Sequence, residues 1–171
     1  MNLNPNFDYK DFLKNFWQKK PKVIRQFISA DKLITPNELA GLACEDFIES
    51  RLVTENPPRQ VQHGPFGEEL FRKLPEKNWS LLVQSVDHYH DGIRLIKELF
   101  DFIPRWRLDD IMVSYATTGG GVGGHFDHYD VFLIQGEGSR LWQLGELCGP
   151  ETKIDDASML NLVSEFSISE E

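Results

Sequence analysis

His125 and Asp127 stand one residue apart in a chain of 171 residues. Residues two apart on a β-strand point to the same face, so this imidazole and this carboxylate would project into one space. An imidazole and a carboxylate are two of the three ligands in the facial triad that binds non-haem Fe(II). The triplet also arises often by chance, and spacing alone favours a strand-end histidine hydrogen-bonded to a nearby aspartate. The metal interpretation therefore depends on the surroundings of the pair.

Two neighbouring features favour the metal interpretation. The run Gly119–Gly121 precedes the pair and lets the backbone pass close to a bound ligand without obstruction by a Cβ atom. Arg140 follows on a predicted strand, and an arginine facing the inside of a barrel is costly unless an anion meets it. A dicarboxylate such as 2-oxoglutarate would supply that anion and could accept two hydrogen bonds from the guanidinium. The alternative, equally simple at this stage, is that Arg140 is an exposed strand residue.

Apolar periodicity and turn residues divide the chain into a helical part and a strand-rich part. Helices are expected at 7–17, after the capping sequence that begins at Thr35, and at 92–102, while 79–87 could form a strand or a buried helix. Strands are expected after Pro21 and at 50–54, 60–63, 110–116, 125–127, 131–135, 139–144 and 159–163, with glycine turns at 117–124 and 136–138. This order predicts an α+β chain that ends in a β-barrel or jelly roll. The helical part would span about 1–106 and the barrel part about 107–171.

Composition limits the classes of partner. The formal net charge is −9 and the pI is near 5.0, which argues against direct binding to nucleic acid and is compatible with a basic polypeptide partner. The simpler alternative is that the acidity only maintains solubility. Cys44 and Cys148 form no C-x-x-C pair, so we expect a reducing compartment. Neither a signal peptide nor a membrane span is visible, and we expect a cytoplasmic protein.

The segments Asp109–Tyr115, Gly119–Gly123 and His125–Gly136 closely resemble the bacterial ribosomal oxygenases. These are JmjC-type cupins that hydroxylate an arginine of large-subunit ribosomal protein sixteen. Matching blocks follow one another in order from Asp11 to about Gly145, so the resemblance covers most of the chain. It implies N-terminal helices packed on a double-stranded β-helix, the cupin/JmjC jelly roll, which would be incomplete in this chain.

The resemblance also implies a role for each candidate residue. His125 and Asp127 would bind Fe(II), Arg140 would pair with the distal carboxylate of 2-oxoglutarate, and Ser114 would lie in the same pocket. The implied function is an Fe(II)- and 2-oxoglutarate-dependent protein hydroxylase acting on an arginine of a basic large-subunit ribosomal protein. In such enzymes the iron and 2-oxoglutarate perform the oxidation, and the protein orients and shields them.

The chain departs from the family after the metal pair. The family's third ligand is a histidine on a later strand, and this sequence ends at Glu171 without a matching segment or the family's dimerisation region. His128 follows Asp127 directly and would face the opposite side of a strand. The other histidines, which we expect to be structural or on the substrate side, are His63, His88 and His90.

Three functions therefore compete at this stage. The first is the hydroxylase, expressed here as one truncated domain over residues 1–171 whose two-ligand site would bind iron weakly. The second is a catalytically inactive fragment or peptide-binding remnant of that family. The third is a different cupin enzyme, which would not need an inward arginine for a dicarboxylate.

Overall fold

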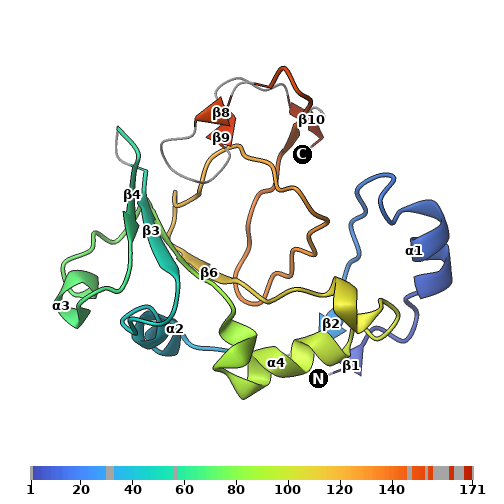
Figure 1. The fold of residues 1–171 in the computed structure, drawn as a ribbon, viewed down its shortest axis with the longest axis horizontal. Helices are drawn as coiled ribbons and strands as arrows, with labels where there is room; N and C mark the ends of the chain where they lie inside the picture. Colours follow the sequence, from blue (N-terminus) through green and yellow to red (C-terminus); the bar gives the residue numbers. More distant parts are fainter. Residues whose placement is uncertain are drawn as a thin grey trace.

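The protein, described by a computed structural model, is an α+β fold built around one antiparallel sheet (Figure 1). The structure describes residues 2–29, 33–55, 58–145, 148–152, 154–155, 162–163 and 168–170. The sheet has four strands in the order β4-β3-β5-β6. Their bounds are Ser50–Thr54 for β3, Gln60–His63 for β4, Trp79–Val83 for β5 and Val113–Ala116 for β6. The strands predicted at 50–54 and 60–63 are confirmed, and the strand predicted at 110–116 is present in shortened form.

The three predicted helices are present as α1, α2 and α4, with α1 and α4 shorter than predicted, whereas α3 and the two 3-10 helices were not predicted. Their bounds are Tyr9–Asn15 for α1, Pro36–Leu42 for α2, Glu68–Phe71 for α3 and Asp91–Glu98 for α4, with the 3-10 helices η1 at Val86–His88 and η2 at Arg105–Arg107. Thr35 and Glu38 form the predicted capping box at the start of α2. The ambiguous stretch 79–87 becomes β5 followed by η1. None of the helices in the described part of the chain could cross a membrane.

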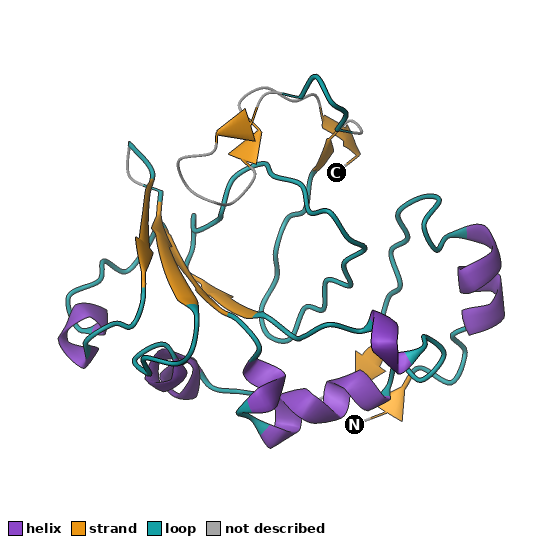
Figure 2. Ribbon diagram, in the orientation of Figure 1, coloured by secondary structure: helices purple, strands orange, loops and turns teal. Residues whose placement is uncertain are grey.

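The main core lies between one face of the sheet and the helices α2 and α4, which run along the lower side of the sheet in Figure 2. Leu52 and Leu81 point into this core, and their side chains are only 1% and 2% exposed. Ile93 and Ile96 fill it from α4, where they lie on one face of the helix. The spacing of apolar residues in α4 therefore determines which side of the helix meets the sheet.

The opposite face of the sheet is polar and has little core of its own. Arg51, Leu82 and Ser114 lie opposite one another in β3, β5 and β6 and therefore share this second face. Its apolar cluster consists of Val53 and Leu82, with partly buried Val61 and Val122 against them. Alternation along the strands thus turns one face toward the helices and leaves the other for the segment that carries the candidate site.

The predicted strands at 125–127, 131–135 and 139–144 are wrong. Between residues 117 and 143 the described chain forms no ladder beyond an isolated bridge at His125. A strand needs a neighbour for its backbone hydrogen bonds, and alternation in the sequence cannot say whether one is present. The remaining strands are short pairs: β1 (Asn2–Leu3) with β2 (Ile28–Ser29), β7 (Leu144–Gly145) with β10 (Ile168–Glu170), and β8 (Ile154–Asp155) with β9 (Leu162–Val163). The chain after Pro21 joins a ladder only at β2, and residues 159–161 of the last predicted strand lie outside the described residues.

Phe132 connects the segment after β6 to the core. Its ring lies 4.7 Å from the ring of Phe100, 5.7 Å from that of Trp17 and 5.8 Å from that of Phe12, measured between centroids. A second contact nearby is the hydrogen bond from Gln18 Nε2 to Asp130 Oδ2, at 3.1 Å. Aromatic packing against the N-terminal helix therefore holds the segment that lacks strand partners.

Candidate functional site

The glycine turn after β6 is fixed against β5. Gly119 has a φ of +77° and Gly123 a φ of +87°, which side chains other than glycine rarely adopt. A Cβ on Gly120 would lie 2.8 Å from the carbonyl carbon of Trp79 and closer still to its oxygen. We expected these glycines to make room for a bound ligand. The structure shows instead that Gly120 makes room for the backbone of β5.

The turn brings His125 and Asp127 together. The Nε2 atom of His125 lies 3.9 Å from Oδ2 of Asp127, and the two side chains are 29% and 36% exposed. The Nδ1 atom of His125 lies 3.0 Å from the carbonyl oxygen of Gly123. A carbonyl only accepts, so Nδ1 carries the proton and the neutral ring keeps its lone pair on Nε2, beside the carboxylate. This tautomer is the one that a metal ion at Nε2 requires.

The donor set fits a divalent first-row metal. Two metal–ligand bonds of about 2.1 Å can span at most about 4.2 Å, and two ligands at a right angle would stand about 3.0 Å apart. The 3.9 Å separation lies inside that limit, and a right-angled arrangement requires the side chains to approach by less than about 1 Å. No group of three His, Cys, Asp or Glu side chains suited to a metal occurs among the described residues.

The other histidines have local contacts. His90 caps α4, where its Nδ1 accepts a hydrogen bond from the backbone N–H of Ile93 at 3.3 Å. His88 lies beside Asp87, with 3.7 Å between Nε2 and Oδ2. The ring of His128 meets that of Phe126 at 5.2 Å. These contacts give His88 and His90 the structural role that we allowed for them.

Arg140 reaches the second face of the sheet. Its Nη1 donates to Oγ of Ser114 at 3.4 Å, across 26 residues of sequence. The guanidinium carbon also lies 5.8 Å from the ring centroid of Trp142. The two residues assigned to 2-oxoglutarate from the resemblance thus meet in the structure. A hydroxyl beside a guanidinium offers one carboxylate both a charge and an extra hydrogen-bond donor.

Tyr129 is the residue that the sequence reasoning missed. Burial raises the pKa of its hydroxyl, and the nearby carboxylates of Asp127, Asp110 and Asp109 raise this pKa further, against the lowering effect of Arg51. Tyr129 is 71% exposed and is influenced by the carboxylate of Asp127 as well as by those of Asp109 and Asp110, which precede β6. A signal for it was present, because residue 129 continues the alternate spacing of 125 and 127.

Asp110 is held in place by β5 and the turn after it. Its Oδ2 accepts hydrogen bonds from Gln84 Nε2 at 2.7 Å and from the backbone N–H and the hydroxyl of Ser85 at 2.8 and 2.7 Å. Gln84 in turn accepts from Arg51 at 3.4 Å. This network fixes a carboxylate at the edge of the second face, near Tyr129.

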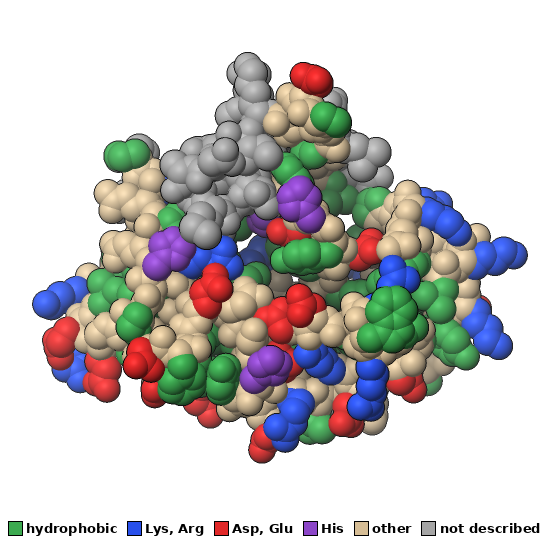
Figure 3. Space-filling model, in the orientation of Figure 1, with side chains coloured by type: hydrophobic (Ala, Val, Ile, Leu, Met, Phe, Trp, Pro, Cys, Tyr) green, Lys and Arg blue, Asp and Glu red, His purple; other side chains and the backbone are tan. Residues whose placement is uncertain are grey.

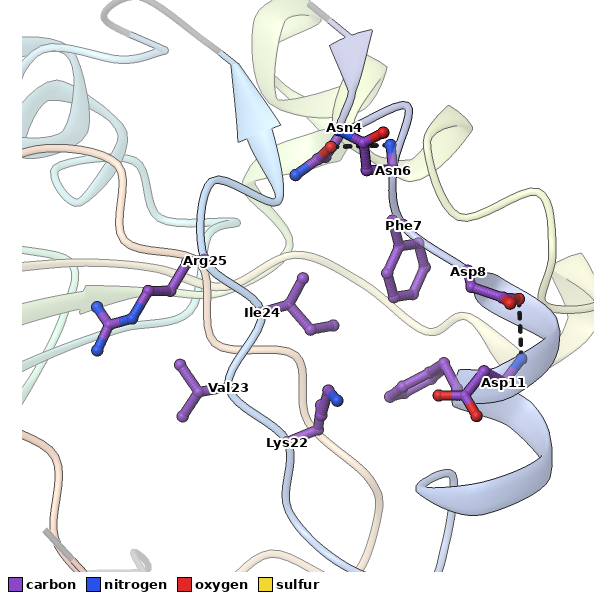
Figure 4. A pocket seen from close by; sticks show the side chains of 10 residues that line it. Asn4, Asn6, Phe7, Asp8, Asp11, Lys22, Val23, Ile24 and Arg25 are labelled. Atoms are coloured by element: carbon purple, nitrogen blue, oxygen red, sulfur yellow. Dashed lines mark hydrogen bonds between the residues drawn. The ribbon is translucent and has the colours of Figure 1, made fainter.

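A cavity of about 320 Å³ lies elsewhere, between α1 and the extended residues 22–25. Figure 4 shows Phe7 and Ile24 facing each other across it, with the carboxylates of Asp8 and Asp11 on the side of α1. Neither the candidate metal ligands nor Arg140 contributes to its walls. The candidate site therefore lies outside this cavity: its two metal ligands are partly exposed, and Arg140 meets the second face of the sheet at Ser114.

Comparison with known proteins supports the resemblance. The model of the JmjC domain matches residues 95–171. The ribosomal protein uL16 3-hydroxylase of Escherichia coli is 47% identical over 148 residues, which are 85% of this chain and 39% of that protein. The probable ribosomal oxygenase of Haemophilus influenzae is 43% identical over 145 residues, which are 83% of this chain and 36% of that protein. Over 83–85% of its length this chain is therefore similar to ribosomal oxygenases, and its second half matches the JmjC domain.

Solved structures agree with this similarity. The X-ray structure of E. coli YcfD matches 99% of this chain with a TM-score of 0.86 and 41% identity, and the match covers 45% of that protein. YcfD in complex with cobalt and 2-oxoglutarate matches with a TM-score of 0.80. The fold prediction of helices with a cupin/JmjC sheet is confirmed. The chain spans less than half the length of these relatives.

Proposed function

We propose that this chain carries the iron pair and the 2-oxoglutarate residues of a protein hydroxylase that acts on an arginine of a large-subunit ribosomal protein. The observation that carries the proposal is the contact between Arg140 and Ser114. Arg140 comes from the same stretch after β6 that brings His125 and Asp127 together. The E. coli relative is named for 3-hydroxylation of ribosomal protein uL16, and YcfD binds cobalt with 2-oxoglutarate and with succinic acid. The proposal places the reaction in the cytoplasm, where bacterial ribosomal proteins are made.

Each residue has a defined task in this proposal. Nε2 of His125 and the carboxylate of Asp127 hold the iron, and the guanidinium of Arg140 with the hydroxyl of Ser114 holds the far carboxylate of 2-oxoglutarate. When bound, iron and 2-oxoglutarate would supply the oxidation by O₂ that converts a C–H bond of the substrate into C–OH. A tyrosine hydroxyl is protonated at neutral pH, and the pKa of Tyr129 is raised further, so the phenol is a hydrogen-bond donor in the neighbourhood of Asp127.

The charge around the site agrees with a basic substrate. Asp109 and Asp110 lie close enough to Tyr129 to raise its pKa, and Asp110 is fixed by three hydrogen bonds. Carboxylates that are held in place attract a guanidinium without further loss of side-chain entropy. An arginine side chain bound beside Tyr129 would therefore lie near these carboxylates.

The test is metal and cosubstrate binding by the purified chain. We expect Co(II) to bind, as a spectroscopic substitute for Fe(II), and His125→Ala or Asp127→Ala to abolish the Co(II) absorption bands, while His63→Ala on the exposed strand β4 leaves them unchanged. Arg140→Ala should weaken 2-oxoglutarate binding about 10- to 150-fold, because hydrogen bonds to a charged group contribute about 1.5–3 kcal/mol. Arg72→Ala, an exposed residue of the turn after α3, is the matched control. Unchanged 2-oxoglutarate affinity in Arg140→Ala would reject the proposed site.

A second candidate is a peptide-binding module without turnover. The observation that favours it is the pair of ligands itself, which is partly exposed and has no third His, Cys, Asp or Glu ligand within the described ranges. Open coordination positions fill with water and lower the affinity for the metal. Incubation of the chain with Fe(II), 2-oxoglutarate and an arginine-containing uL16 peptide separates the two. Addition of one oxygen atom to the peptide, seen by mass spectrometry, supports the hydroxylase, and metal-independent peptide binding without oxygen addition supports the module.

A further inference from the structure

Charge is distributed unevenly along this acidic chain. Residues 8–25 contain six lysines and arginines and two aspartates, a net charge of +4, whereas the whole chain carries −9 and the rest therefore −13. Figure 3 shows blue Lys and Arg side chains gathered at the edge of the molecule that Figure 1 labels α1. From the overall net charge we expected no direct binding to nucleic acid. That single number does not show that the positive charge is concentrated in residues 8–25.

Aromatic rings gather these cations into one surface. The Nζ atoms of Lys20 and Lys22 lie 4.8 and 3.9 Å from the ring centroid of Phe16. The guanidinium of Arg107, from η2, lies 5.6 Å from the ring of Trp17. Two segments more than eighty residues apart thus contribute to the same surface. We call this surface the basic patch and define it by Lys14, Lys19, Lys20, Lys22, Trp106 and Arg107.

The cations of the basic patch form no ion pair with a carboxylate of the described residues. Elsewhere, three exposed arginines have carboxylate partners: Arg59, Arg72 and Arg94 lie 2.8, 2.6 and 2.5 Å from carboxylate oxygens. Lys19 donates only to a backbone carbonyl, that of Lys14. The positive charge of the patch is therefore available to an external anion.

Trp106 distinguishes the patch from a merely charged surface. Its side chain is 84% exposed, and it stands between Arg105 and Arg107 in η2. The Arg107 guanidinium lies 5.7 Å from its ring. An indole held open to water beside unpaired cations presents a flat face for stacking and charges for phosphates, the combination that binds single strands of nucleic acid.

We infer that the basic patch binds single-stranded nucleic acid, with the lysines on its phosphates and a base stacked on Trp106. An acidic protein would also meet these charges, but a single strand offers both the phosphates for the cations and a flat base to stack on the indole. The cavity beside Lys22 is excluded from the path, because Asp8 and Asp11 on its other side would repel phosphates. The strand therefore follows the outer side of Lys20 and Lys22 toward η2. This inference does not depend on the proposed hydroxylase activity.

The experiment measures the anisotropy of a fluorescent uridine oligomer titrated with the full chain. We expect binding at low salt, and a plot of log affinity against log salt with a slope no steeper than about −3.5, the limit for five phosphate contacts on a single strand. Lys19→Glu with Lys20→Glu should lower the affinity at least about 10-fold. Lys73→Glu with Lys77→Glu makes the same change of net charge on exposed residues outside the patch and should leave most of the affinity.

Trp106→Ala tests the stacking. Loss of one base–aromatic stack should weaken binding about 5- to 150-fold, whereas Phe47→Ala, which also removes an exposed ring, should not. Single-stranded RNA and single-stranded DNA are both tried, and binding of either supports the inference. Three results overturn it: no binding at low salt, equal loss in the two charge-reversal variants, or polyglutamate binding as tightly as the oligomer with no effect of Trp106→Ala.

Discussion

Phe132→Ala is expected to release the segment that carries the candidate site. This segment forms no ladder between residues 117 and 143 in the described chain, and its packing against the core depends on the Phe132 ring. That ring contacts Phe12, Trp17 and Phe100 at centroid distances of 5.8, 5.7 and 4.7 Å. Truncation to alanine removes all three contacts while leaving the metal ligands and Arg140 in the sequence.

The size of the effect follows from the burial of the ring. Phe→Ala in a full core costs about 3–5 kcal/mol, and Phe132 is only half-buried, so we expect about 2 kcal/mol. Three aromatic contacts of about 0.5–1.5 kcal/mol each give a similar figure. A loss of about 2 kcal/mol lowers the docking equilibrium of the segment about 30-fold. Apparent affinity for a ligand falls in proportion to the docked fraction.

Urea unfolding gives the loss of stability, and titrations with Co(II) and 2-oxoglutarate give the loss of binding. Leu133→Ala is the control, because the side chain of Leu133 is 57% exposed and contributes little to the core. We expect Phe132→Ala to lower both stability and binding, and Leu133→Ala to change neither by much. If Phe132→Ala lowers stability but both ligands still bind as before, the segment is positioned by something other than this ring and the reasoning is wrong.

Three further variants test the elements around the site. Gly120→Ala should lower the urea midpoint by an amount equivalent to about 1–3 kcal/mol, because the new methyl group would overlap β5. Gly136→Ala, whose methyl group would meet nothing within 4 Å, should not. Burial raises the pKa of Asp87, but the hydrogen bond from Lys97 and other contacts outweigh this and hold the pKa below the ordinary 3.8. The pKa of Asp87 is lower in the folded than in the unfolded chain, so the ionised carboxylate stabilises the fold. This stabilisation is full above pH 3.8 and is lost as the pH falls through the folded pKa. Asp87→Asn should therefore flatten the dependence of the unfolding free energy on acid pH. Thr35→Ala removes the capping box and should cost about 1 kcal/mol by thermal unfolding.

Local chemistry made much of the fold predictable. Thr35 and Glu38 predict the start of α2, because the two residues of a capping box satisfy each other's backbone donors and need no partner from elsewhere in the chain. The spacing of the apolar residues Ile93 and Ile96 predicts the helix α4 and also predicts which face of that helix is buried. The strands β3 and β4 were also predicted from their residue types and lie side by side in the sheet, whereas the apolar run 79–87, whose first part forms β5, could not be distinguished from a buried helix.

The barrel strands were not predictable in the same way. Residues 125–127, 131–135 and 139–144 have the residue types of strands, but alternation reports a preference for one buried face and not the presence of a partner. Where no described segment lies beside them, the chain runs as an extended loop held by Phe132. Strand formation is a property of pairs, and a single segment cannot determine it.

The candidate site was found partly by residue type and partly by likeness. The spacing of His125 and Asp127 was weak evidence, and the contact between Ser114 and Arg140 across 26 residues was invisible to any local pattern. Tyr129 was missed because a tyrosine is rarely read as part of a metal site. Its role depends on carboxylates that come from before β6, and only the fold brings them near.

Exposure of the site segment has an electrostatic consequence. Leu141 and Trp142 are 71% and 42% exposed beside Arg140, so water reaches the guanidinium that would hold 2-oxoglutarate. Two unit charges about 4 Å apart interact by about 1 kcal/mol in water and about 4 kcal/mol near a partly shielded protein surface. Whatever covers Leu141 and Trp142 would therefore strengthen the interaction between Arg140 and the dicarboxylate, and salt would then weaken that interaction less. Apolar cover and charge recognition are linked here, because the same side chains decide how much water surrounds Arg140.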